Sequence, residues 1–342
     1  MSRVVRNQVL VGDATEQLRK LPDGSIDMVL TSPPYFRLRN YEVDGQLGLE
    51  GHVEAWVTGL RTVAAECARV LVPTGSLWLN LGDTFSTHAR QGAIRKSLLL
   101  GPERLALALT RDGWTLRNKI VWAKTNPVPS SVRDRLSATH ELIYVLVRQA
   151  DYFFDLDSIR EPHTSKITKR RAIKDRGIEA WRGPNGDDAA GLDTIKAEGR
   201  VGHPLGKNPG DVWRLASSSY RGAHHATFPV QLATRMLMAG CPEKRCTACR
   251  LPHKRRLIRA LGGTAVRGAL GPTCDCSAPA EPGFVLDPFF GAGTTAVAAE
   301  AHGRDWLGIE LNPDFAKLAT RRIEAARATS ATSPPNSTRR PA

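Results

Sequence analysis

The chain has 342 residues, of which 48 are Lys or Arg and 34 are Asp or Glu, so its formal net charge is +14. With 41% hydrophobic residues it can bury a sizeable core, and its length corresponds to one large domain with insertions or to two domains. It has neither a run of 18 apolar residues nor an apolar N-terminal signal, so we expect an intracellular protein with no membrane span. The positive charge favours a polyanionic partner, because neutralised phosphates release counterions.

Apolar and polar segments alternate along most of the chain. They predict strands at 8–11, 26–30, 76–83, 116–124 and 140–148, separated by helices at 14–24, 52–71 and 102–113. After a polar, glycine-rich stretch, regular structure returns with helices at 228–240 and 313–327 and a strand–turn–helix–strand segment at 283–312. Strands that alternate with helices indicate an α/β fold with a mostly parallel sheet.

A glycine-rich turn follows the predicted strand that ends at Asp287. Gly291 and Gly293 let the backbone approach a ligand closely, and the segment lacks the GxxxxGK[ST] pattern of a triphosphate site. The Asp287 carboxylate can point into the crevice at the carboxyl edge of the sheet, and Glu310 ends the next strand, where it can accept from both ribose hydroxyls. A nucleoside fits this pattern at least as well as a dinucleotide, which Ala296 at the third glycine position would tolerate; an ordinary βα turn is the alternative.

The predicted strand at 26–30 is followed by Thr31-Ser32-Pro33-Pro34-Tyr35. Two consecutive prolines remove two N–H donors and fix two φ angles, and the residue before each proline is held extended. The Ser32 hydroxyl and the Pro33 carbonyl therefore form a rigid, acceptor-rich edge that suits an amino group, and Tyr35 offers a ring on which a base can stack. A rigid turn with a core tyrosine is the alternative.

Taken together, the two segments resemble the DNA amino-methyltransferases that use S-adenosylmethionine. The catalytic motif of that family, (D/N/S)PP(Y/F), reads TSPPY at 31–35, and its cofactor motif, FxGxG, reads FFGAG at 289–293. The catalytic motif comes first, which is the permuted order of the β class. The resemblance implies a Rossmann-like methyltransferase sheet in circularly permuted order.

Three further segments resemble motifs of the same family. VGDA at 11–14 matches an acidic motif that contacts the cofactor adenine, HHATFP at 224–229 matches a segment that closes over the methionine end of the cofactor, and 122–146 matches a W-K-N-P…H-E stretch. The resemblance assigns cofactor binding to Asp13, Thr31, His225, Phe228, Pro229, Asp287, Phe289, Gly291, Gly293, Thr294, Thr295 and Glu310. It assigns catalysis to Ser32, Pro33, Pro34 and Tyr35.

The serine form of the catalytic motif is typical of cytosine-N4 enzymes, whereas Asp or Asn is typical of adenine-N6 enzymes. Ser32 and the Pro33 carbonyl would accept from the exocyclic amine of a flipped cytosine, so that its lone pair can attack the methyl group without a covalent intermediate. Adenine-N6 methylation on the same fold is the second hypothesis. Cytosine-C5 chemistry is disfavoured, because the chain has no Pro-Cys pair.

Five of the six cysteines lie within a short stretch of the second half of the chain. Cys246-x2-Cys249 and, after 24 residues, Cys274-x-Cys276 resemble a zinc ribbon, although one residue rather than two separates the second pair. We expect a structural zinc ion on these four thiolates, with free thiols as the alternative. Cys241 is expected to pack or to lie beside the cofactor rather than to bind metal.

The domain organisation follows from these assignments. We expect a catalytic half at 1–155, a target-recognition region at 156–222, a cofactor half at 223–327 with the Cys-rich insert at 241–282, and a disordered tail at 328–342. Residues 160–221 carry 13 Lys and Arg against 8 acids, and residues 241–276 carry 8 against 2. The charge is thus concentrated in the two segments foreign to the core, as expected if they hold DNA.

We therefore expect double-stranded DNA as the partner and a cytoplasmic, nucleoid-associated protein of a bacterium, an archaeon or a phage. A homodimer and a cognate restriction endonuclease are both compatible with this class. A non-catalytic zinc-ribbon DNA-binding protein is a third hypothesis, disfavoured by the intact motifs. Lys124 is expected to touch DNA, Asp83 to line the crevice, and His140 and Glu141 to fix the fold near the active site.

Overall fold

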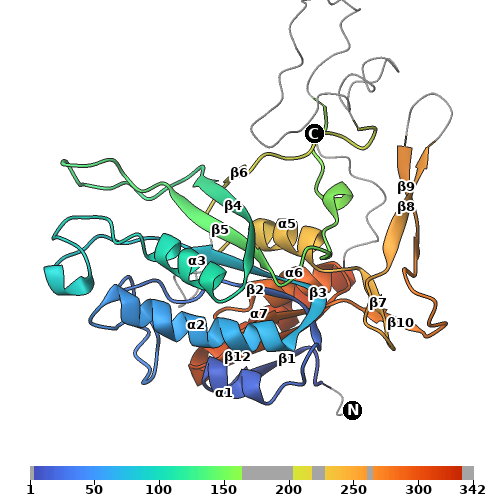
Figure 1. Cartoon of the computed structure of the whole chain (residues 1–342), viewed down its shortest axis with the longest axis horizontal. Coiled ribbons are helices and arrows are strands. Elements are labelled where there is room, and N and C mark those ends of the chain that lie inside the picture. The colour runs from blue at the N-terminus through green and yellow to red at the C-terminus, as the bar shows by residue number, and fades with distance from the viewer. Residues whose placement is uncertain (1–3, 164–202, 218–227, 260–264, 333–342) are drawn as a thin grey trace, which may run out of the picture. The chain divides into compact units, whose positions relative to one another are not determined.

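The computed structural model describes most of the chain, namely residues 4–163, 203–217, 228–259 and 265–332 (Figure 1). It divides into two compact units. The first is drawn from residues 1–155, 210–254 and 272–342, and the second from residues 156–209 and 255–271. Among the helices in the described ranges, none is both long enough and apolar enough to span a membrane.

The first unit is built on an eight-stranded sheet with the order β1-β12-β11-β2-β3-β5-β4-β6. Its strands are β1 (Gln8–Val11), β2 (Ile26–Thr31), β3 (Leu71–Leu81), β4 (Thr115–Lys124), β5 (His140–Val147), β6 (Val212–Leu215), β11 (Phe284–Asp287) and β12 (Asp305–Glu310). All neighbouring strands are parallel except at β5, which runs antiparallel to both β3 and β4. The predicted α/β class and mostly parallel sheet are confirmed.

Helices cover the sheet on both faces (Figure 1). They are α1 (Ala14–Arg19), α2 (Val53–Val70), α3 (Gly101–Arg111), α5 (Val230–Gly240), α6 (Thr294–Ala301) and α7 (Pro313–Thr332), with short 3-10 helices η1 (Ala89–Gln91) and η2 (Leu156–Ser158). α1, α2 and α3 contact one another in sequence, and so do α5, α6 and α7. The last helix reaches Thr332, so the chain stays helical beyond 327, where we expected the tail to begin.

Successive side chains of a strand point to opposite faces of the sheet, so a strand that is apolar throughout can be covered by helices on both faces. Every residue of β2 is buried, which is typical of a strand covered on both faces. Val29 and Leu77 belong to the core that includes the apolar face of α2. On the other face, a Cβ added at Gly240 of α5 would meet Trp78 at 2.5 Å and Met28 at 3.0 Å, so this glycine permits close packing of α5.

The order of strands brings together two segments that are far apart in the sequence. β11 lies beside β2 and parallel to it, with Val285 paired with Met28. Because the carboxyl ends of parallel strands meet at one edge of a sheet, the segments that follow β2 and β11 are neighbours. The Thr31 hydroxyl donates to the Asp287 carboxylate over 2.6 Å, which ties the two strand ends together.

The strand β6 was not expected, because it lies inside the polar region assigned to 156–222. It pairs in parallel with β4 at the edge of the sheet. The side chain of Trp213 in β6 is buried, and the Trp122 indole of β4 donates to the Leu215 carbonyl of β6 over 3.0 Å. Its burial pattern of one buried residue in four hides it from a search for apolar periodicity.

The Cys-rich insert contributes two small sheets. The strands β7 (Lys244–Cys246) and β10 (Ala280–Pro282) pair antiparallel in the first unit. The strands β8 (Lys254–Arg259) and β9 (Ala265–Gly271) form a separate two-stranded sheet, most of which belongs to the second unit. Lys254, Arg255 and Arg256 of β8 are exposed, so this sheet presents a basic surface.

Candidate active site

A cavity opens at the carboxyl edge of the sheet, where the segments after β1, β2, β11 and β12 meet. Six residues that the sequence assigned to the cofactor line it: Asp13, Phe228, Phe289, Gly291, Thr294 and Glu310. Ser32 and Pro34 of the TSPPY segment line it as well. The two predicted motifs therefore share one cavity.

Five other predicted cofactor residues, Thr31, Pro229, Asp287, Gly293 and Thr295, do not line this cavity. His225 lies outside the described residues. One wall of the cavity was not predicted from the sequence. It is formed by Tyr41, Val43 and 45–47 before α2 and by Phe315 of α7. The rings of Tyr41 and Phe315 meet edge to face, with 6.1 Å between centroids. An aromatic residue in a polar loop gave too weak a signal to be noticed.

The glycine turn between β11 and α6 has the backbone that only glycine adopts readily. Gly291 and Gly293 have φ angles of 52° and 73°. Phe290 stacks on Trp306, with 5.3 Å between ring centroids, and a Cβ added at Gly308 of β12 would meet the Phe290 ring at 2.4 Å. Gly308 thus allows Phe290 to lie flat on the sheet and to anchor the turn.

We expected Asp287 to point into the crevice, but its side chain is buried beneath this turn and supports it. Its side chain accepts from the hydroxyls of Thr31 and Thr295, each over 2.6 Å, and from the Phe289 N–H over 3.1 Å. Burial raises the pKa of this carboxyl to about 6, against the lowering effect of its three donors. Asp287, Thr31 and Thr295 therefore act on the cavity by shaping its wall.

Two acidic residues do face the cavity. Glu310 accepts from the Gly291 N–H over 2.7 Å through one oxygen and from the Asn312 N–H over 2.9 Å through the other. Burial raises its pKa above the ordinary value. Asp13 caps α1 by accepting from the Glu16 N–H over 3.0 Å. Each carboxylate oxygen has a second lone pair, so both residues can still accept from a ligand.

The TSPPY segment is held rigidly at the other side of the cavity. The Pro34 carbonyl accepts from the Trp56 indole over 2.9 Å. The Pro33 carbonyl accepts no hydrogen bond from any residue that the structure describes. The Pro33 carbonyl can therefore accept a further hydrogen bond, and its predicted role with Ser32 toward an amino group stays a prediction.

Behind Ser32 lies a network of polar side chains from three strands. The Tyr35 hydroxyl donates to Glu141 of β5 over 2.6 Å and lies 3.2 Å from the Ser32 hydroxyl. Lys124 of β4 donates to the second Glu141 oxygen over 2.6 Å. Asn80 of β3, which is 1% exposed, points its amide nitrogen into the same cluster. From the sequence, Glu141 was expected to fix the fold near the active site, whereas Asn80 was not predicted because it lies in a buried, mostly apolar strand.

Close packing locks the tyrosine of this network in place. A Cβ added at Gly82, just after β3, would meet the Tyr35 ring at 2.6 Å. Burial, reinforced by Glu141, raises the pKa of Tyr35 well above its ordinary value, so its hydroxyl keeps its proton. Tyr35 is therefore a fixed donor to Glu141.

Two neighbouring residues named from the sequence are bonded within the fold, while the contact of Lys124 with DNA stays a prediction. Lys124, expected to touch DNA, is engaged with Glu141, and its ammonium lies 5.1 Å from the centroid of the Trp122 ring. Asp83, expected to line the crevice, instead accepts from the N–H groups of Leu100 and Gly101 at the start of α3. Both side chains are occupied by contacts within the fold, as Glu141 also is.

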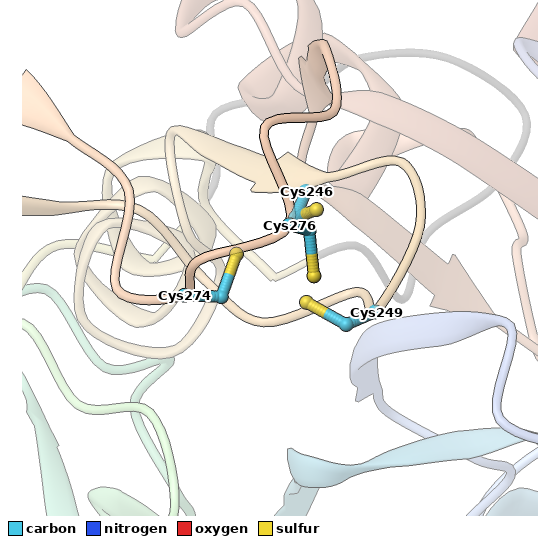
Figure 2. Close-up of side chains that lie close together, drawn as sticks. All are labelled: Cys246, Cys249, Cys274 and Cys276. Carbon is cyan, nitrogen blue, oxygen red and sulfur yellow. The ribbon is translucent and has the colours of Figure 1, made fainter.

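The four cysteines at the ends of the insert converge (Figure 2). The sulfur atoms of Cys246, Cys249, Cys274 and Cys276 all lie within 4.8 Å of one another, and Figure 2 shows them pointing toward a common centre. β7 and β10 hold one end of this cysteine knuckle together, because Ala280 pairs with Cys246. Cys67 is buried elsewhere, and so is Cys241, for which packing was expected.

Comparison with known proteins agrees with this site. The family model described as DNA methylase (N6_N4_Mtase) matches residues 26–321. The type II methyltransferase M.Cfr9I of Citrobacter freundii is 31% identical over 335 residues, which cover 92% of this chain and 86% of that protein.

Two solved structures share the fold. The cytosine-N4-specific PvuII DNA methyltransferase matches with a TM-score of 0.57 at 16% identity and covers 95% of this chain and 91% of its own. A Thermus thermophilus protein in complex with S-adenosyl-L-methionine matches with a TM-score of 0.53 at 23% identity, covering 94% of each chain. The chain belongs to the DNA methylase family of S-adenosylmethionine-dependent N4/N6 amino-methyltransferases.

Proposed function

We propose that this DNA methyltransferase is site-specific and methylates the exocyclic N4 amine of a cytosine flipped out of double-stranded DNA. The observation that carries the proposal is the position of Ser32, which lines the cofactor cavity and directly precedes Pro33 in the chain. The cytosine-N4 specificity of the structurally similar PvuII enzyme supports it. Adenine-N6 methylation is the alternative, since both amines can donate to the same two acceptors.

The cavity fits the nucleoside part of S-adenosylmethionine, which supplies the methyl group when bound. Glu310 would accept from the ribose hydroxyls, and Asp13 from the adenine amine. Phe289, Phe315 and Tyr41 offer flat apolar surface for the base. Gly291 brings the backbone close to the ligand, while Asp287 keeps the turn formed behind it.

The residues of the TSPPY segment would position the target base. The amine donates its two hydrogens to the Ser32 hydroxyl and the Pro33 carbonyl, which pulls the nitrogen toward a tetrahedral geometry and directs its lone pair at the methyl group. The target nitrogen is unreachable in a stacked duplex, so the base must be flipped. Tyr35 is held by its hydrogen bond to Glu141, and its ring would stack on the flipped base.

The cysteine knuckle would hold one structural zinc ion. Four sulfur atoms within 4.8 Å of one another are the donor set and spacing of a tetrahedral zinc site after a small contraction. The exposed Lys254, Arg255 and Arg256 lie between the two cysteine pairs of the knuckle in the chain, where they can contact phosphates. We assign target recognition to residues 156–222 and phosphate contacts to this basic insert.

The decisive experiment identifies the methylated base. DNA treated with the protein and isotopically labelled S-adenosylmethionine is digested to nucleosides, and mass spectrometry should find N4-methyldeoxycytidine. Label in N6-methyldeoxyadenosine would instead establish the alternative. Ser32→Ala should lower kcat by roughly 100-fold with unchanged cofactor affinity, because it removes one positioned acceptor. The exposed Ser97→Ala is the matched control, and near-normal turnover of Ser32→Ala would overturn the mechanism.

A further inference from the structure

The hydrogen bonds around Ser32 have a defined direction. A tyrosine hydroxyl has a single proton, and that of Tyr35 is donated to Glu141 over 2.6 Å. In the 3.2 Å contact between Ser32 and Tyr35, the proton must therefore come from Ser32. A serine hydroxyl also has one proton, so the Ser32 oxygen is left with lone pairs only toward the cavity that it lines.

Asn80 reinforces the same direction. Its amide nitrogen lies 2.7 Å from Glu141, 2.9 Å from the Tyr35 hydroxyl and 3.3 Å from the Ser32 hydroxyl, all of which can accept. Its amide oxygen is buried and has no hydrogen-bond partner among the described residues. Turning the amide round would bring that oxygen against the Glu141 carboxylate, so the nitrogen stays in place.

Glu141 is the origin of this order. It accepts through one oxygen from Tyr35 and Asn80 and through the other from Lys124. A carboxylate can only accept, so every neighbour must turn its proton toward it. Lys124 satisfies the oxygen that faces away from Tyr35.

We propose that Glu141, acting through Tyr35 and Asn80, is a positioning residue that makes the Ser32 hydroxyl a pure hydrogen-bond acceptor toward the target amine. A serine can otherwise donate as well as accept, and a donor facing the amine would compete for its lone pair. This inference rests on the proposed role of Ser32 and applies equally to a cytosine or an adenine amine.

Glu141→Gln tests the direction of these hydrogen bonds, because glutamine has nearly the same side-chain shape as glutamate but carries an NH2 donor. Because Lys124 needs an acceptor, the oxygen of the introduced amide would face Lys124 and its NH2 group would face Tyr35, whose proton would then turn toward Ser32. We expect kcat to fall at least about tenfold, with the affinity for S-adenosylmethionine and the melting temperature nearly unchanged. Tyr35→Phe, which keeps the ring but removes the relay, should lower kcat similarly.

Two double variants separate this role from a merely structural one. In the Ser32→Ala background, Glu141→Gln should cause no further loss of kcat, because it acts through the missing hydroxyl. Adding Lys124→Met to Glu141→Gln frees the amide oxygen for Tyr35 and should restore kcat several-fold relative to Glu141→Gln alone.

Multiplicative losses in both double variants, or normal kcat in Glu141→Gln, would overturn the inference. A near-normal Ser32→Ala variant would instead refute the proposed function itself, so the two failures are distinguishable. Calorimetric titration with S-adenosylmethionine on each variant confirms that the cavity is intact.

Discussion

The glycine turn at 287–293 and the cysteine knuckle at 246–276 are both candidate ligand sites, and they are supported in opposite ways. At the glycine turn, the carboxylate that faces the ligand is already bonded within the protein, since Glu310 accepts from the Gly291 and Asn312 N–H groups. The turn also rests on Asp287, which is 1% exposed. This site is formed before its ligand arrives.

The cysteine knuckle is supported only by local contacts among its described residues, such as the bond from the Arg250 N–H to the Cys246 carbonyl over 3.0 Å. Its strands β7 and β10 have three residues each, and Cys249 and Cys276 are exposed. Thiol groups form only weak hydrogen bonds, so little besides a metal can hold four of them together. The cofactor cavity is therefore preorganised by the core, whereas the proposed zinc ion would hold the knuckle together.

The largest expected effect is the loss of that ion. Structural zinc in small domains contributes roughly 10–16 kcal/mol, so Cys276→Ser should reduce zinc below about half an equivalent per chain and expose 244–282 to proteolysis. S-adenosylmethionine binding should persist, because the cavity uses other residues. Elemental analysis and limited proteolysis measure these outcomes.

The matched control for the zinc prediction is Cys67→Ala, which alters a buried thiol far from the knuckle in the sequence and should keep a full equivalent of zinc. Unchanged zinc and proteolysis in Cys276→Ser would contradict the dependence of the knuckle on metal. Loss of cofactor binding together with zinc would show that the two regions are coupled.

The next effect concerns Arg245, which precedes the knuckle but belongs to the core. It is 1% exposed and donates to the Ser25 carbonyl and to Asp27 over 2.9 and 3.0 Å, and to Glu281 over 2.8 Å. Arg245→Met leaves the buried Asp27 carboxylate without its partner and should lower the free energy of unfolding by about 3–5 kcal/mol, with zinc retained.

Urea denaturation measures this loss. Adding Asp27→Leu removes the stranded charge and should recover much of it, because a buried ion pair can be replaced by apolar residues at little cost. A double variant as unstable as Arg245→Met alone would contradict the charge argument.

A smaller effect is a pH dependence of the free energy of unfolding, which arises from the buried Asp287 carboxyl that supports the glycine turn. Burial raises the pKa of Asp287 from an ordinary 3.8 to about 6, so the folded protein retains a proton that the unfolded chain releases between these values. Stability therefore falls as the pH rises through this window, by about 3 kcal/mol in total.

Asp287→Asn has no proton to release. The free energy of unfolding of the wild type relative to this variant should thus decrease from pH 4 to pH 7 in urea titrations. If the difference in free energy of unfolding between the two proteins did not change with pH, burial would not favour the protonated form of Asp287.

The smallest of these effects is on cofactor affinity. Glu310→Ala removes the acceptor for the ribose and frees the Gly291 N–H, and should weaken S-adenosylmethionine binding by roughly 10–100-fold, as expected for hydrogen bonds to a charged group. Asp314→Ala on the exposed start of α7 is the control. Calorimetric titration gives the affinities, and equal values for both variants would remove Glu310 from the site.

Local sequence determined a large part of this protein. The apolar runs of β2, β3 and β5, the positive-φ glycines and the consecutive prolines act through short-range sterics and burial, so each can be read from a few residues. The TSPPY and FFGAG motifs and the paired cysteines could also be found this way. β6 and the loop around Tyr41 could not, because neither has a periodic apolar pattern.

Only the tertiary structure decided which polar groups face one another. Asp287 and Glu310 both end strands, yet one is enclosed by two threonine hydroxyls and the other lines the cavity. Asn80, Lys124 and Glu141 lie on three strands and meet at Ser32 because β3, β5 and β4 pair in that order. The direction of a hydrogen bond depends on its partner, and partners distant in sequence are fixed by the sheet order.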